Sequence, residues 1–176
     1  QIFGRIKQYL LTNVTTVMKK LICVISCFLI LSNIGHAQWE QTSTGIWGGN
    51  INAITANPLT NDLYAGTSYG IYKSTDSGSS WTAINNGLLH PDIRAIAINE
   101  TSIFAGTNGG GVFLSNDNGN SWSPVNEGLT NLSVRSIAIN RNNIFIGTSD
   151  SGVFLSNDYG ISWLQVNNGL TNLRVK

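Results

Sequence analysis

The eight residues Ser74-Thr-Asp-Ser-Gly-Ser-Ser-Trp81 decide the architecture of this chain, because the same pattern returns twice. It recurs as Ser115-Asn-Asp-Asn-Gly-Asn-Ser-Trp122 and as Ser156-Asn-Asp-Tyr-Gly-Ile-Ser-Trp163, with a spacing of 41 residues each time. The flanking segments repeat with it, since 103–107 (Ile-Phe-Ala-Gly-Thr) aligns with 144–148 (Ile-Phe-Ile-Gly-Thr). The chain beyond residue 37 is therefore an internal repeat, and its period sets the unit of structure.

Each repeat carries the pattern of four short strands. In the third repeat they are predicted at 134–140, 143–148, 152–156 and 163–166, which are rich in β-branched or aromatic residues and bounded by Gly, Asn, Asp or Ser. Four strands in ~40 residues match one blade of a β-propeller. The sequence thus predicts an all-β fold of four-stranded antiparallel blades. A sandwich or a meander remains the alternative, because four strands per repeat do not require a closed ring.

The repeat boundaries divide residues 38–176 into three blades and two fragments. The blades are predicted at 51–87, 93–128 and 134–169. The segment 38–45 has the same Trp-to-Gly spacing as the end of a blade, so it is predicted to form an outer closing strand, and 173–176 is predicted to begin a fourth blade. Because rings have about 4–8 blades, we expect the sequence to be an incomplete part of a longer propeller.

Residues 18–37 show the three parts of a secretory signal peptide. Two lysines follow Met18, an apolar run of 11 residues occupies 21–31, and small residues precede the expected cleavage after Ala37. This run is shorter than the ~20 residues of a spanning helix, so we expect an extracytoplasmic protein with no membrane span after cleavage. A membrane anchor is the alternative. Residues 1–17 form an upstream extension without an assigned role.

Composition excludes several classes of site. All nine acidic residues but only six of the ten basic ones lie beyond residue 37, so the mature part has a net charge of −3 and no nucleic-acid partner is expected. The two cysteines, Cys23 and Cys27, lie in the predicted leader, and two histidines are too few for a histidine-rich metal centre. No metal and no cofactor are predicted.

The S-x-D-x-G-x-x-W segment resembles the Asp-box, also called the BNR repeat. Propellers with this box include sialidases, sortilin-type receptors, xyloglucan-degrading hydrolases and photosystem II assembly factors. The resemblance extends over 38–176 and implies a β-propeller in which the box joins the third and fourth strands. It does not select a function, because the same box occurs on enzymes, receptors and assembly factors.

The residue types of the box suit a structural turn. Ser and Asp oxygens accept hydrogen bonds from backbone N–H groups, Gly permits a positive φ, and Trp packs on the blade edge. The predicted structural residues are Ser74, Asp76, Gly78, Trp81, Ser115, Asp117, Gly119, Trp122, Ser156, Asp158, Gly160 and Trp163. A catalytic or calcium-binding role is the alternative, which a single carboxylate per box does not favour.

No catalytic residues are predicted in this sequence. The resemblance to sialidases would imply an arginine triad, a tyrosine–glutamate pair and an early Arg-Ile-Pro-like motif, and that motif is missing from the sequence. The aspartates outside the boxes, Asp62, Asp92 and Asp150, suit loop capping. The sequence also has no recognisable nucleophile–base pair or phosphate loop.

One cationic position repeats. Arg94, Arg135 and Lys176 are 41 residues apart, each at the beginning of an innermost strand and on the face opposite the boxes. A cationic arc there predicts a ligand-binding rim for an acidic peptide or glycan, and structural ion pairs or solvated rim charges are the competing interpretation. The sequence favours a secreted, non-enzymatic binding module with a protein or glycan ligand. The alternative is a sialidase-like or xyloglucanase-like glycoside hydrolase whose catalytic residues lie mostly outside this sequence.

Overall fold

The computed structural model describes residues 45–46 and 49–176. The predicted leader, the upstream extension and most of the predicted outer strand at 38–45 lie outside the described residues. The described part is all-β, as predicted, and contains no helix, hence none long and apolar enough to cross a bilayer.

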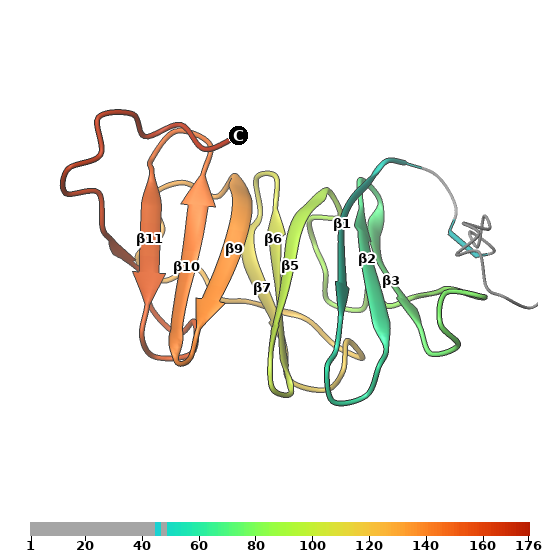
Figure 1. Cartoon of the computed structure of the whole chain (residues 1–176). Helices are drawn as coiled ribbons and strands as arrows, with labels where there is room; N and C mark the ends of the chain where they lie inside the picture. Colours follow the sequence, from blue (N-terminus) through green and yellow to red (C-terminus); the bar gives the residue numbers. More distant parts are fainter. Residues whose placement is uncertain (1–44, 47–48) are drawn as a thin grey trace, which may run out of the picture. The chain divides into compact units, whose positions relative to one another are not determined.

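Twelve described strands form three four-stranded antiparallel sheets, which follow one another in chain order (Figure 1). Sheet 1 contains β1 (Ile51–Ala56), β2 (Leu63–Thr67), β3 (Gly70–Ser74) and β4 (Thr82–Ala83). Sheet 2 contains β5 (Ile93–Asn99), β6 (Ser102–Thr107), β7 (Gly111–Ser115) and β8 (Ser123–Pro124). Sheet 3 contains β9 (Val134–Asn140), β10 (Asn143–Thr148), β11 (Val153–Ser156) and β12 (Leu164–Gln165).

The strands of the third repeat lie close to their predicted positions. β9 and β10 have the predicted bounds, and β11 begins one residue later than predicted, because Gly152 has a φ of +74° and belongs to the preceding turn. β12 is shorter than predicted, since only two of its residues pair with β11. Strong alternation of apolar residues thus located the inner strands better than the outer one.

The connections divide between the two ends of the sheets. The innermost strands β1, β5 and β9 all begin at the end that lies uppermost in Figure 1, which we call the rim end. Because the strands of each sheet are antiparallel and lie in chain order, the turn between the third and fourth strands lies at the other end, which we call the box end. The repeated Ser-x-Asp segments therefore occupy the box end.

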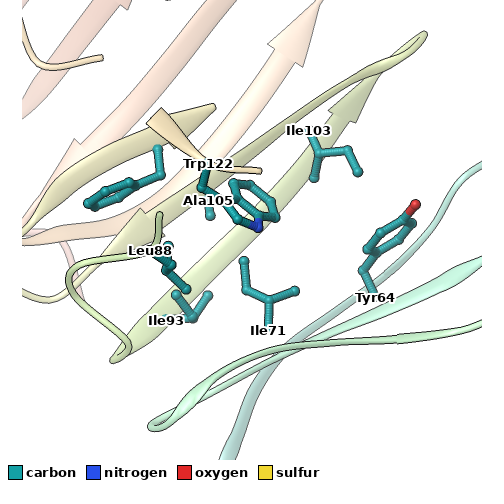
Figure 2. Close-up of a cluster of buried hydrophobic side chains, with 8 residues drawn as sticks. Tyr64, Ile71, Leu88, Ile93, Ile103, Ala105 and Trp122 are labelled. Carbon is teal, nitrogen blue, oxygen red and sulfur yellow. The ribbon is translucent and has the colours of Figure 1, made fainter. Parts of the chain in front are cut away.

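Two apolar clusters join the sheets. The first joins sheets 1 and 2 and consists of Tyr64, Ile71, Leu88, Ile93, Ile103, Ala105, Phe113 and Trp122 (Figure 2). The second joins sheets 2 and 3 and consists of Phe104, Val112, Val134, Ile144, Ile146, Phe154 and Trp163. Successive residues of β6 alternate between the two clusters, because side chains alternate between the faces of a strand. Sheet 2 is therefore buried on both faces.

In sheets 1 and 2, a glycine in the second strand lets the innermost strand of the next sheet approach. A Cβ atom on Gly106 would lie 2.6 Å from Cγ1 of Val134, and one on Gly66 would lie 2.5 Å from Cγ2 of Ile93. Any larger residue would separate the two sheets. The recurring Gly-Thr pair of the sequence is thus a contact between repeats.

Candidate functional site

At the box end, each aspartate is held by its own loop. Oδ1 of Asp76 accepts hydrogen bonds from the Ser74 hydroxyl (2.8 Å) and the Ser80 backbone N–H (2.9 Å), and Oδ2 accepts one from the Ser80 hydroxyl (2.6 Å). The Gly78 N–H, at a φ of +90°, donates to the Ser74 hydroxyl at 2.9 Å. The same bonds surround Asp117 and Asp158 in the second and third boxes.

These hydrogen bonds lower the pKa of all three box aspartates to about 2. The largest cause is the hydroxyl of the serine four residues later (Ser80, Ser121 or Ser162), which donates to the ionised carboxylate. These serines recur before each tryptophan, but no role was predicted for them from the pattern S-x-D-x-G-x-x-W. A carboxyl group with such a pKa is ionised at neutral pH and cannot serve as a general acid.

Two box tryptophans bind the preceding sheet. The indole N–H of Trp122 donates to the carbonyl of Ile84 at 2.7 Å, and that of Trp163 donates to the carbonyl of Val125 at 2.8 Å. The indole N–H of Trp81 donates to Gly78 within its own box at 3.2 Å. The predicted packing on the blade edge therefore crosses from one repeat to the one before it.

At the rim end, Arg94 and Arg135 occupy β-bulges. The register of β5 against β6 shifts between Ile93 and Ala95, which leaves Arg94 without a partner in the ladder. Arg135 holds the same place in β9, and Asn52 holds it in β1. A bulge directs its extra side chain away from the regular alternation and is common beside binding sites. The spacing of 41 residues predicted that these positions are equivalent, but it did not predict the bulge.

Arg94 is neutralised by a neighbour. Its Nη2 lies 2.7 Å from Oδ2 of Asp92, and the side-chain amide of Asn108 donates to the same oxygen at 2.9 Å. The hydroxyl of Ser133, from the connection into sheet 3, then donates to Asn108 at 2.8 Å. At this member of the predicted rim, the competing interpretation of a structural ion pair therefore describes the observed contacts.

Arg135 and Lys176 lie in a different environment, an open pocket of about 370 Å³ at the rim end of sheet 3. The pocket is lined by Arg135, Ser149, Asp150, Arg174, Val175 and Lys176. Within the described residues neither Arg135 nor Lys176 forms an ion pair. Arg174, which the sequence analysis did not single out, adds a third cation here. The pocket therefore carries an excess of positive charge.

The three aspartates outside the boxes are each paired with a cation. Asp62 lies 2.8 Å from Nζ of Lys73, and that hydrogen bond lowers the pKa of Asp62. Asp92 pairs with Arg94, and Asp150 lies 3.4 Å from Nε of Arg174. No three His, Cys, Asp or Glu side chains gather within the part of the chain that the structure describes.

No protein-family model and no curated protein matches this sequence. The fold is similar to that of solved structures, among them an ancestral GH74 enzyme (25% identity, TM-score 0.56, covering 70% of this chain and 19% of that one). Others are YCF48 bound to D1 peptide (18%, 0.57, 68% and 42%) and YCF48 from Cyanidioschyzon merolae (16%, 0.54, 66% and 36%). The chain spans less than half the length of each of these proteins.

GH74 enzymes and YCF48 are β-propeller proteins, so the predicted fold class is confirmed. The three sheets correspond to three blades of such a propeller. Because the two YCF48 structures are less than 25% identical to this chain, they establish only the architecture. The chain has the fold of β-propeller blades, built from three copies of a four-stranded antiparallel unit.

Proposed function

We propose that this chain is a non-enzymatic binding module of the Asp-box propeller type, which takes an anionic protein segment or glycan at the rim end of sheet 3. The observation that carries the proposal is the pocket of about 370 Å³ in which Arg135, Arg174 and Lys176 face a single carboxylate, Asp150. A concave surface with an excess of one charge attracts ligands of the opposite charge.

The charges in this pocket are available to a ligand. The pair of Arg174 and Asp150 is long, at 3.4 Å, and its side chains are 68% and 61% exposed. Exposed pairs of this kind contribute little to stability, so a ligand carboxylate or sulfate can replace Asp150 at low cost. Arg135 adds a planar guanidinium that binds such anions through two parallel hydrogen bonds. Arg94, already bonded to Asp92, should contribute less.

A protein ligand is supported by one of the structural neighbours, YCF48, whose structure includes a bound D1 peptide. That complex belongs to YCF48, and its identity to this chain is 18%. It supports the idea that blades of this architecture can present a peptide-binding surface. It does not specify the peptide for this chain.

Binding should be measured with two anionic probes, a fluorescent polyglutamate peptide and a sulfated heparin oligosaccharide. We expect Arg135→Glu to weaken binding of the probe that the wild type binds more tightly by about tenfold or more, because this variant reverses a charge inside the pocket. Added salt should weaken binding by the wild type, since exposed charges are screened over ~8–10 Å. Arg141→Glu is the matched control, because it changes the net charge equally but lies in the turn between β9 and β10, at the box end.

Two results would count against this proposal. An equal loss in the Arg135 and Arg141 variants would reduce the effect to net charge, and binding of neither probe would leave the pocket without its proposed ligand class. A hydrolase is the second candidate, favoured by the 25% identity to the ancestral GH74 enzyme. Release of reducing sugar from xyloglucan or of sialic acid from a sialoside would support that candidate.

We also propose that the protein is exported, on the basis of the leader-like residues 18–37. The mass of the N-terminal peptide of the expressed protein tests this. A mature chain beginning at Gln38 is expected, and a cytosolic chain that keeps residues 18–37 would contradict it.

A further inference from the structure

The third box differs from the other two at its exposed positions. Tyr159, Ile161 and Leu164 are 53%, 70% and 70% exposed. At the equivalent positions the first repeat has Ser77, Ser79 and Thr82, and the second has Asn118, Asn120 and Ser123, all of which are exposed. A serine, asparagine or threonine in six equivalent places shows that the fold itself does not need an apolar residue there. Exposed apolar residues that gather beside a groove mark an interaction surface.

The backbone at Tyr159 strengthens this interpretation. Tyr159 has a φ of +61°, and its equivalents Ser77 and Asn118 have 60° and 58°. Asparagine is among the residues that tolerate this left-handed region, whereas a bulky aromatic residue there is unusual. The third repeat therefore keeps a large exposed ring at a position where a small polar residue would be easier to accommodate. Departures from local preference of this kind are concentrated at functional sites.

One of the three residues, Ile161, lines a groove of about 600 Å³. It is lined by Pro124, Val125, Asn126, Glu127, Gly128 and Ile161, so it lies between the outer part of sheet 2 and the third box. Glu127 forms a parallel bridge with Ser162, and its carbonyl accepts the backbone N–H of Trp163 at 2.9 Å. Ile161 and Glu127 therefore line one groove, and Tyr159 lies two residues from Ile161 in the same turn. We call this the box 3 surface (Tyr159, Ile161, Pro124 and Glu127). Leu164 is not part of it, because Leu164 pairs with Leu155 on the face of sheet 3 opposite to Phe154, which packs against sheet 2.

The charge of this groove indicates its partner. In the equivalent place between sheets 1 and 2, the side-chain amide of Asn86 donates to the carbonyl of Asn120 at 3.3 Å. Between sheets 2 and 3, Glu127 stands at the position of Asn86 and Ile161 at the position of Asn120. The carboxylate of Glu127, which accepts hydrogen bonds, therefore replaces the side-chain amide that donates one. The Glu127 carboxylate forms no ion pair or side-chain hydrogen bond among the described residues. A lysine or arginine side chain of a binding partner could donate hydrogen bonds to both the Glu127 carboxylate and the carbonyl of Ile161.

We propose that the box 3 surface docks a protein segment in which a lysine or arginine lies between apolar residues. The basic side chain bonds to Glu127, and the apolar residues cover Ile161 and the ring of Tyr159. This site is at the box end and the outer edge of sheet 3, so it is separate from the cationic rim pocket.

The test uses the full chain and a fluorescent heptapeptide of alternating leucine and lysine, with an alternating leucine–glutamate peptide as its counterpart. The double variant Tyr159→Asn, Ile161→Asn installs the residues of the second repeat, which the same turn already accommodates. We expect this variant to bind the leucine–lysine peptide about tenfold or more weakly than the wild type does. Glu127→Asn should weaken the same peptide and leave the weak binding of the glutamate peptide unchanged or improved.

Two matched controls separate this surface from general stickiness and net charge. Leu89→Ser removes another exposed leucine, 76% exposed and outside the box 3 surface. Glu100→Asn removes one negative charge at an exposed turn with a φ of 53°. Equal losses in these controls, equal binding of the two peptides, or no binding of the leucine–lysine peptide would overturn the proposal. Concentration-dependent dimers that the double variant abolishes would also overturn it, in favour of a second copy as the occupant. Arg135→Glu should leave this binding intact, so its outcome is independent of the rim proposal.

Discussion

Single side chains in this protein act mainly by completing a loop that the backbone cannot complete alone. Each box aspartate accepts two hydroxyl bonds and one backbone bond, and the glycine between them turns the chain at a positive φ. In the second and third boxes, the tryptophan that follows donates to a carbonyl of the preceding repeat. One short motif thus fixes its own turn and one contact to a neighbour.

The box aspartates should make stability depend on acid. Their folded pKa of about 2 lies below the ordinary value of 3.8. The unfolded chain therefore binds protons first, and the stabilisation is complete above about pH 4 and lost as the pH falls through 2. We expect the urea midpoint to fall between pH 4 and pH 2, and to fall less in Asp117→Asn. Equal acid sensitivity in the wild type and the variant would contradict this assignment.

Truncation of a box tryptophan should be costly where the ring is buried between sheets. Trp122 is 3% exposed and bonds to Ile84 of the preceding sheet. We expect Trp122→Ala to lower the free energy of unfolding by about 3–5 kcal/mol, the range for a large aromatic residue. Trp81→Ala should cost less, because Trp81 is less buried and its indole N–H bonds within its own box. Urea denaturation measures both, and a shift near zero for Trp122→Ala would refute the interface role.

At the scale of elements, the contacts between sheets depend on close backbone approach. The segment that follows one box lies beside the box of the next repeat. The glycine six residues after a box tryptophan therefore contacts the tryptophan of the next repeat, as Gly87 contacts Trp122 and Gly128 contacts Trp163. A Cβ atom on Gly87 would lie 2.3 Å from the carbonyl oxygen of Trp122, whereas one on Gly169 would meet no atom of the described residues within 4 Å. The two glycines share a φ of +83°.

Alanine variants of Gly87 and Gly169 separate the cost of backbone strain from the cost of steric crowding. Gly169→Ala should cost only the left-handed conformation, about 1–2 kcal/mol. Gly87→Ala should cost about 1–3 kcal/mol more, because the added methyl group forces the Trp122 segment to move. Denaturant titration of both variants gives the difference. Equal losses would show that the sheets can separate at this point without a penalty.

At the scale of the whole molecule, the sheets form a linear series in which each contacts its neighbour. Sheet 1 contributes only to the first apolar cluster and sheet 3 only to the second, while sheet 2 contributes to both. In such arrays, stability is approximately a sum of repeat and nearest-neighbour terms. Disruption of one interface should therefore destabilise mainly the sheets that form it.

Hydrogen exchange should reveal this series. Phe154 is 1% exposed in the second cluster, so we expect Phe154→Ala to cost about 3–5 kcal/mol at the interface of sheets 2 and 3. Amides of β9–β11 should lose protection, while those of β1–β3 keep theirs. Phe113→Ala, in the first cluster, should have the reverse effect. Uniform loss of protection in either variant would show that the three sheets unfold as one unit.

The repeat, the all-β class and the positions of the inner strands follow from the sequence, because the period of 41 residues and the alternation of apolar residues are local patterns along the chain. The same period also aligns Arg94 with Arg135. Tertiary structure alone decided how these residues differ. Arg94 is neutralised by Asp92, whereas Arg135 and Arg174 meet in a pocket. It also decided that Trp122 bonds to the preceding sheet and that Gly106 makes room for Val134. Each of these contacts depends on the distance between residues of different turns or repeats. Such a distance is set by the packing of the sheets and cannot be read from a local sequence pattern.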